Sequence, residues 1–196
     1  MSQTPQDDNP WILAPLLPEA AEPERALPPQ SVAAPQPGVN LPHPTRLLPV
    51  RAQPETAPLW WVGAHGGAGE STLAALHPGH RETGHSWPLH IDGTPVNVML
   101  VARTNHAGLK AAAAAAQHWA SGTLPHVTLL GLVLVADIPG KLPRPLREQQ
   151  TIVAGGVPRT WSVPWIEQWR LGEPLPAGKV PPALRSLAAD LDTILA

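Results

Sequence analysis

Residues Leu59–Ala74 read Leu-Trp-Trp-Val-Gly-Ala-His-Gly-Gly-Ala-Gly-Glu-Ser-Thr-Leu-Ala, the pattern of a short apolar strand, a glycine-rich turn and a helix start. A phosphate-binding loop has this layout, with the motif G-x-x-x-x-G-K-[ST]. The last glycine, the lysine and the hydroxyl residue of the motif fall on Gly69, Glu70 and Ser71, whereas the first glycine falls on Ala64. The chain therefore keeps the backbone pattern of a phosphate cradle but carries a carboxylate in place of the lysine.

The chemistry of such a loop depends on backbone N–H groups that converge on anionic oxygens at a helix start. Glycines allow the close approach, and the sequence supplies them at positions 66, 67 and 69. In this interpretation Ser71 binds Mg²⁺, and Thr72 lies near an α-phosphate. The missing lysine normally neutralises charge on the β- and γ-phosphates. At about 4 Å, replacing attraction by repulsion changes the interaction by several kcal/mol at an effective dielectric near 20. We therefore expect neither tight ATP binding nor fast hydrolysis.

Other interpretations of the loop stay open at this stage. Glu70 can be protonated or recruit a cation, or a basic side chain from elsewhere can replace the lysine. Arginines that we expect near the same sheet edge are Arg103, Arg144, Arg147 and Arg159. Alternatively the loop is only a turn, in which Glu70 favourably caps its helix N-terminus.

Composition limits the classes of function. A net charge of −2 over 196 residues gives no direct signal for nucleic acid. The chain has no cysteine, which excludes disulfides and thiolate metal sites. We find no signal peptide and no apolar run of the roughly 18 residues that span a membrane, so a soluble cytoplasmic protein is expected.

The chain divides into two parts. Residues 1–57 hold roughly half of the 27 prolines, which predicts an extended, disordered Pro-rich tail. Residues Asn9–Leu13 form an apolar island in this tail, and Trp11 either packs loosely on the chain's own domain or anchors a protein partner. Residues 58–196 alternate strand and helix patterns, which predicts a three-layer α/β domain with a mostly parallel sheet.

Within the second part, the hydrophobic patterns predict a series of elements. Strands are expected at 59–62, 96–102, 127–136 and 159–163, with a further short one near 87–91. Helices are expected from 71 to 76, 107 to 120, 145 to 154 and from 181 to the end. Pro181 and Pro182 suit the first turn of that last helix.

The loop sequence His65-Gly66-Gly67-Ala68-Gly69-Glu70-Ser71-Thr72 resembles the deviant phosphate loop of the partition-type ATPases, the ParA/MinD group, with its pattern K-G-G-x-G-K-[ST]-[ST]. Both lysines of that pattern are changed here, to His65 and Glu70. Residues Leu130–Val135 resemble a later strand of that family, which implies a place near a bound base for Asp137. Residues Val163–Trp165 resemble the element after its next strand, which implies the same for Pro164. The resemblance covers about residues 58–196 and implies a P-loop NTPase-like fold, with ATP or ADP and Mg²⁺ as ligands if any bind.

The same resemblance bears on partners. ParA relatives dimerise around nucleotide, which implies a homodimer, but His65 cannot supply their lysine contact across that dimer. The whole pattern also looks like an uncharacterised actinobacterial family of P-loop-like proteins, plausible on plasmids or conjugative elements. That family implies a fold and little chemistry.

A nucleotide site of this kind also needs an acid for the Mg²⁺ shell. Asp92, after the short strand near 87–91, is one candidate, although Asp-Gly is equally typical of a turn. Asp137 is the other, because ligands of open α/β folds bind at the carboxyl edge of the sheet. It can equally cap the turn before Pro139.

Two further patterns carry less weight. Histidines at 77, 80, 85 and 90 match no firm zinc template and suit a solvated loop. Tryptophans at 161, 165 and 169 form either part of the core or an aromatic wall for a base or partner. We therefore expect a degenerate nucleotide-fold protein that serves as an interaction or regulatory module. An active, atypical ATPase and a pure scaffold with an empty loop are the alternatives.

Overall fold

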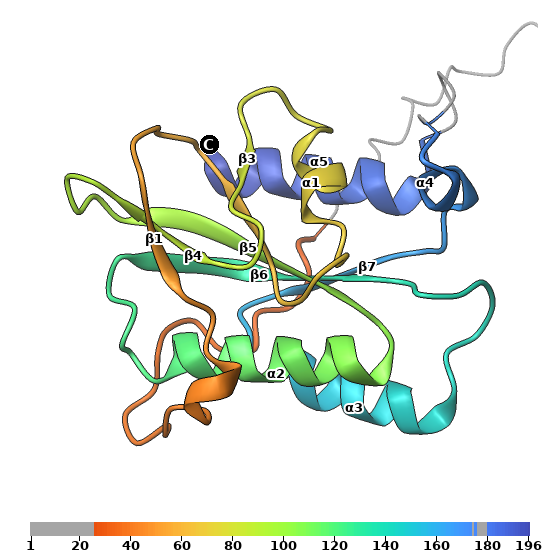
Figure 1. The fold of residues 1–196 in the computed structure, drawn as a ribbon. Coiled ribbons are helices and arrows are strands. Elements are labelled where there is room, and N and C mark those ends of the chain that lie inside the picture. The colour runs from red at the N-terminus through yellow and green to blue at the C-terminus, as the bar shows by residue number, and fades with distance from the viewer. Residues whose placement is uncertain (1–25, 174, 176–179) are drawn as a thin grey trace, which may run out of the picture.

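The computed structural model describes residues 26–173, 175 and 180–196 as an α/β domain (Figure 1). A five-stranded sheet has the order β3 (Arg81–Glu82), β2 (Trp60–Gly63), β5 (Val96–Arg103), β6 (Val127–Val135) and β7 (Thr160–Val163). A second sheet pairs β1 (Val50–Gln53) with β4 (Trp87–His90). The helices are α1 (Glu70–Ala74), α2 (His106–Ala120), α3 (Arg144–Ala154), α4 (Glu167–Leu171), α5 (Pro182–Leu195) and the 3-10 turn η1 (Pro44–Arg46). All strand pairs in the described chain are parallel, which confirms the expected class.

Helices cover both faces of the main sheet, with α2 and α3 on one side and α1 and α5 on the other (Figure 1). Along β5 the buried side chains alternate between the two sides: Val98 and Leu100 belong to the core under α2, whereas Met99 and Val101 belong to the core under α5. This period of two is that of a strand buried on both faces. Three layers follow from it, as the sequence predicts.

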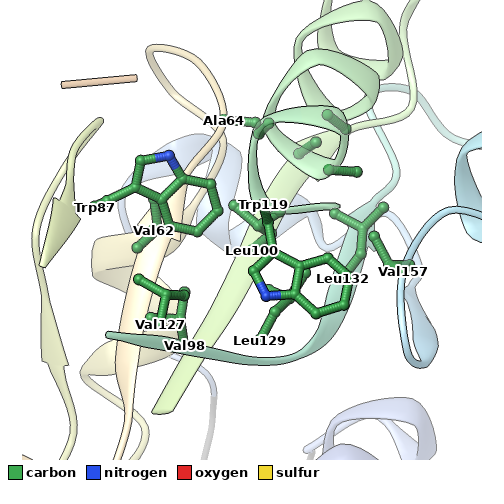
Figure 2. Close-up of a cluster of buried hydrophobic side chains, with 14 of the residues drawn as sticks. Val62, Ala64, Trp87, Val98, Leu100, Trp119, Val127, Leu129, Leu132 and Val157 are labelled. Atoms are coloured by element: carbon green, nitrogen blue, oxygen red, sulfur yellow. The ribbon is translucent and has the colours of Figure 1, made fainter. Parts of the chain in front are cut away.

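The core under α2 contains three buried indoles, those of Trp60, Trp87 and Trp119. Trp87 from β4 and Trp119 from α2 pack among the branched side chains of β2, β5 and β6 (Figure 2). Small residues along α2, among them Ala112 and Ala115, let that helix lie close to the sheet. The alanine run at 111–116 therefore has a packing role in addition to its helix propensity.

The strand order places the loop at a particular point of the sheet. Strand β3, which follows β2 in the sequence, pairs with one edge of β2. Strand β5 pairs with the opposite edge of β2. Such a reversal is the place where open α/β sheets bind ligands, beyond the carboxyl ends of their strands. The loop after β2 and the end of β5 at Arg103 therefore meet at the switch point of this sheet.

The segment before residue 58 differs from expectation. Disorder was expected through residue 57, but residues 26–57 lie on the domain. The N–H groups of Ser31 and Gln36 donate to the carbonyls of Pro158 and Ala120, both at 2.9 Å. Residues 50–53 form β1 by pairing with β4. Proline does not prevent this, because an extended chain needs only some of its N–H groups to attach to a neighbour. Trp11 lies outside the described residues.

Candidate functional site

The predicted strand, turn and helix start are confirmed, with the loop running from Gly63 to α1. Gly63 pairs with Val101 of β5, and α1 begins at Glu70. Gly69 has a φ of +108° as the residue before the helix, a left-handed conformation that a side chain disfavours. Helix α1 ends at Ala74 and is shorter than the expected 71–76, because the chain turns at His77.

The Glu70 side chain folds back into the loop. Its Oε2 accepts a hydrogen bond from the N–H of Gly69 at 2.9 Å, and the residue is only 8% exposed. A Cβ placed on Gly63 would lie 2.7 to 2.9 Å from the three carboxylate atoms. The absence of a side chain at Gly63 thus makes room for this carboxylate. The Glu70 carboxylate therefore occupies the inner side of the turn.

His85, from the turn between β3 and β4, completes the surroundings of that carboxylate. Its Nδ1 lies 3.6 Å from Oε1 of Glu70 and 3.3 Å from the carbonyl oxygen of Gly63. A proton on Nδ1 would serve both oxygens. The sequence pattern placed His85 in a solvated loop, and nothing in its spacing from Glu70 signals the contact.

Arg103 is the basic side chain that the structure brings to the loop. Its Nε donates to the carbonyl oxygen of Gly67 at 3.2 Å, and its Nη1 donates to that of Ala136 at 3.1 Å. Its Nη2 would lie 4.0 Å from a Cβ on Gly69. Burial chiefly lowers the pKa of Arg103; Asp137 and Glu70 act in the opposite direction. Arg103 therefore joins the loop to the end of β6.

His65 is held inside the chain by both ring nitrogens. Nε2 accepts from the backbone N–H of Arg103 at 3.0 Å, so the ring proton is on Nδ1, which donates to the carbonyl oxygen of Gly66 at 2.9 Å. A Cβ on Gly108 of α2 would lie 2.8 Å from Nε2. This imidazole therefore connects the loop to β5 and α2.

The remaining predicted site residues fall into two groups. Ser71 is exposed on the first turn of α1, Thr72 is half-buried beside it, and Ala68 is buried under the loop. Asp137 and Pro164 follow β6 and β7, at the same carboxyl edge as the loop. The structure thus brings these residues to one edge of the sheet.

Asp92 does not join them. It lies in the turn between β4 and β5, ahead of Val96, whereas the loop faces the other end of β5. Eight residues of strand separate the two ends, about 25 Å. Asp92 accepts hydrogen bonds from the His90 ring and the Thr94 N–H, which lower its pKa. The expected metal role of Asp92 beside Ser71 is therefore not supported, and its turn interpretation accounts for the contacts.

The histidine cluster has a packing role. The rings of His77 and His80 stack at 4.2 Å, and the Trp61 indole N–H donates to Nδ1 of His80 at 3.2 Å. Within the described residues no group of three metal-ligating side chains is placed to hold an ion. The described helices also include none that is long and apolar enough to cross a bilayer.

A comparison with protein families identifies the group to which the site belongs. The model of the Family of unknown function (DUF6668) matches residues 57–186. The chain belongs to this family. The DUF6668 match begins just before β2 and ends inside α5, so it contains the loop, Arg103 and the whole main sheet. No curated protein and no solved structure matches the chain.

Proposed function

We propose that this DUF6668 protein is a degenerate ParA/MinD-like P-loop protein that acts as an interaction or regulatory module without hydrolysing nucleotide. Its process would be the maintenance or transfer of a plasmid or conjugative element. The loop at the switch point of a parallel sheet supports the P-loop part of the proposal. The Glu70 carboxylate inside that loop supports the non-hydrolysing part.

The residues present do not fit a magnesium triphosphate. A phosphate in this turn would need the Gly69 N–H, which donates to Glu70, and would lie against a carboxylate of its own sign. Of the two candidate acids for Mg²⁺, Asp92 lies at the far end of β5 from the loop, and Asp137 shares the carboxyl edge of the sheet with the basic side chain Arg103. The turn therefore has the backbone of a phosphate loop and an internal carboxylate as its occupant.

A nucleotide-gated homodimer also lacks support in the loop. The contact expected across such a dimer would come from the position of His65, whose two nitrogens are engaged within the chain. A protein partner is therefore proposed to bind elsewhere, with the Trp11 region as the proposed contact.

Calorimetric titration with ATP or ADP and Mg²⁺ tests the proposal. We expect no binding heat from the wild type and restored binding in Glu70→Lys, where the carboxylate is replaced by the lysine of the motif. Glu70→Gln is the matched control, since it removes the charge without supplying a cation. Micromolar ATP binding with turnover by the wild type would contradict the proposal.

A second candidate, an atypical active ATPase, is favoured by Arg103 alone. Its guanidinium reaches the loop beside Gly69 and is the cation that could replace the lysine. This candidate requires turnover in the wild type that Arg103→Ala abolishes. A pure scaffold, the third candidate, requires that Glu70→Lys also fails to bind nucleotide while remaining folded.

A further inference from the structure

A groove lies between the 3-10 turn η1 and the first half of α2, beside the loop strand. We name it the α2 groove; it measures about 350 Å³ and is lined by Thr45, Arg46, Leu47, Leu48, Ala64, Ala107, Lys110, Ala111 and Ala114. Its floor is apolar, with Ala64 and Ala114 buried and Leu48 half-buried. Its two charged members, Arg46 and Lys110, are both exposed cations. A groove of this volume accommodates a large aromatic side chain with an acidic flank.

Charge distinguishes this groove from three others described in the chain. The cavity of about 80 Å³ between α1 and α5 includes Asp192 in its lining. The groove beside α4 includes Glu173, and the one between α2 and α3 has no charged lining residue. Among these four, the α2 groove alone combines an apolar floor with cations and no carboxylate.

The chain itself contains a segment with the complementary chemistry. Residues 7–17 read Asp-Asp-Asn-Pro-Trp-Ile-Leu-Ala-Pro-Leu-Leu, two carboxylates followed by an aromatic and aliphatic run. Residues 1–25 contain five acidic residues and a single arginine, although the whole chain has a net charge of only −2. The rest of the chain is therefore net basic, and attraction between the two parts favours contact within one molecule.

The connection is long enough. Ser31 is fixed by its hydrogen bond to Pro158, and twenty residues that span up to about 66 Å separate it from Trp11. Helix α2 measures only about 22 Å from end to end. Residues 7–17 can therefore reach the α2 groove without displacing the chain that follows Ser31.

We propose that residues 7–17 dock in the α2 groove of their own molecule, with Trp11 on the apolar floor and Asp7 and Asp8 facing Arg46 and Lys110. Ala64 of the loop strand belongs to the floor, so the docked segment covers one wall of the phosphate-loop region. The inference does not depend on nucleotide binding. It places Trp11 within its own molecule, so the partner contact proposed above would require residues 7–17 to leave the α2 groove.

Zero-length carbodiimide cross-linking of the full chain, followed by peptide mass spectrometry, tests this proposal. The reagent joins carboxylates to amines in contact, and the chain has only three lysines, Lys110, Lys141 and Lys179. We expect Lys110 to be joined to Asp7 or Asp8 within one copy, whereas Lys141, outside the groove, is not. Absence of that link, or a link found only between differently isotope-labelled copies, would overturn the proposal.

Two variants make the test specific. Trp11→Ala should lower the yield of the Lys110 link about tenfold, because tryptophan is among the residues whose truncation weakens an interface most. Lys110→Glu should remove the link, and adding Asp7→Lys and Asp8→Lys should restore it with the charges exchanged. All four positions are exposed or lie outside the described residues, so circular dichroism should report an unchanged fold. An unrestored link in the charge-exchanged chain would contradict the assigned pairing.

Discussion

At the residue scale, Glu70 determines how the loop is interpreted. The same position in a working phosphate loop points a cation at the ligand, whereas here a carboxylate turns back on the N–H of Gly69. The side chain is nine-tenths buried, so its contacts are part of the packing. Burying this group without the Gly69 N–H would carry a desolvation cost.

The missing side chain at Gly63 gives a stability prediction for this arrangement. Gly63→Ala should lower the free energy of unfolding by about 1–3 kcal/mol, because its Cβ would overlap the carboxylate of Glu70. Urea denaturation measures the change. Gly66→Ala is the control, since its Cβ would meet only His85, at an ordinary 3.8 Å. Equal stability of the two variants would show that the carboxylate does not lie over Gly63.

The sequence predicts the position of Glu70 but not its conformation. Motif spacing alone identified the loop, because glycines and a hydroxyl at fixed offsets are read directly from the chain. The contacts of His85 and Arg103 with the loop join residues 15 to 38 positions apart, and only the strand order brings them together. The prediction that Asp92 lies near the loop was wrong for the same reason, because its position in the sequence does not show at which edge of the sheet it lies.

At the element scale, strong periodicity predicted the central strands and the long helices. Strands β5 and β6 and helices α2, α3 and α5 lie within a few residues of their expected bounds. The elements that were missed are short, such as β1, β3 and α4. Strand β3 has two residues, too few to show a hydrophobic periodicity, and β1 exists only because β4 pairs with it. Their positions depend on tertiary contacts, which a local pattern does not contain.

Helix α5 supplies a prediction at this scale, because a buried hydrogen bond joins it to the sheet edge. The indole N–H of Trp161 in β7 donates to Oδ2 of Asp190 in α5 at 2.8 Å. Asp190→Leu should cost about 1–3 kcal/mol more than Asp190→Asn, because only asparagine keeps an acceptor for the buried indole. Hydrogen exchange of the α5 amides should rise in the leucine variant alone. Similar exchange rates in both variants would show that the Trp161–Asp190 hydrogen bond does not hold α5 against the sheet.

At the scale of the whole molecule, tryptophan–histidine pairs lie on both sides of the sheet. Trp87 donates to Nδ1 of His118 at 3.1 Å in the core under α2, and Trp61 donates to Nδ1 of His80 on the opposite side. Each bond requires a histidine nitrogen without a proton. The chain has no Tyr or Phe, so its aromatic packing depends on tryptophans, and these two find histidine acceptors for their N–H groups. Both layers of the core therefore depend on neutral imidazoles.

This dependence predicts a loss of stability in acid. Burial lowers the pKa of both His80 and His118 below the ordinary 6.5; repulsion from the charge of His77 lowers that of His80 further, and attraction to Asp192 opposes the shift. The unfolded chain then binds more protons than the folded one below pH 6.5. Stability is therefore complete above that pH and falls as the pH drops toward the folded-state pKa values, by at most about 1.4 kcal/mol per pH unit for each histidine. Urea midpoints at pH 7.5 and pH 5 measure the fall. His118→Gln should reduce it, whereas the exposed His106→Gln should leave it unchanged; equal falls in both variants would mean that other groups carry the acid sensitivity.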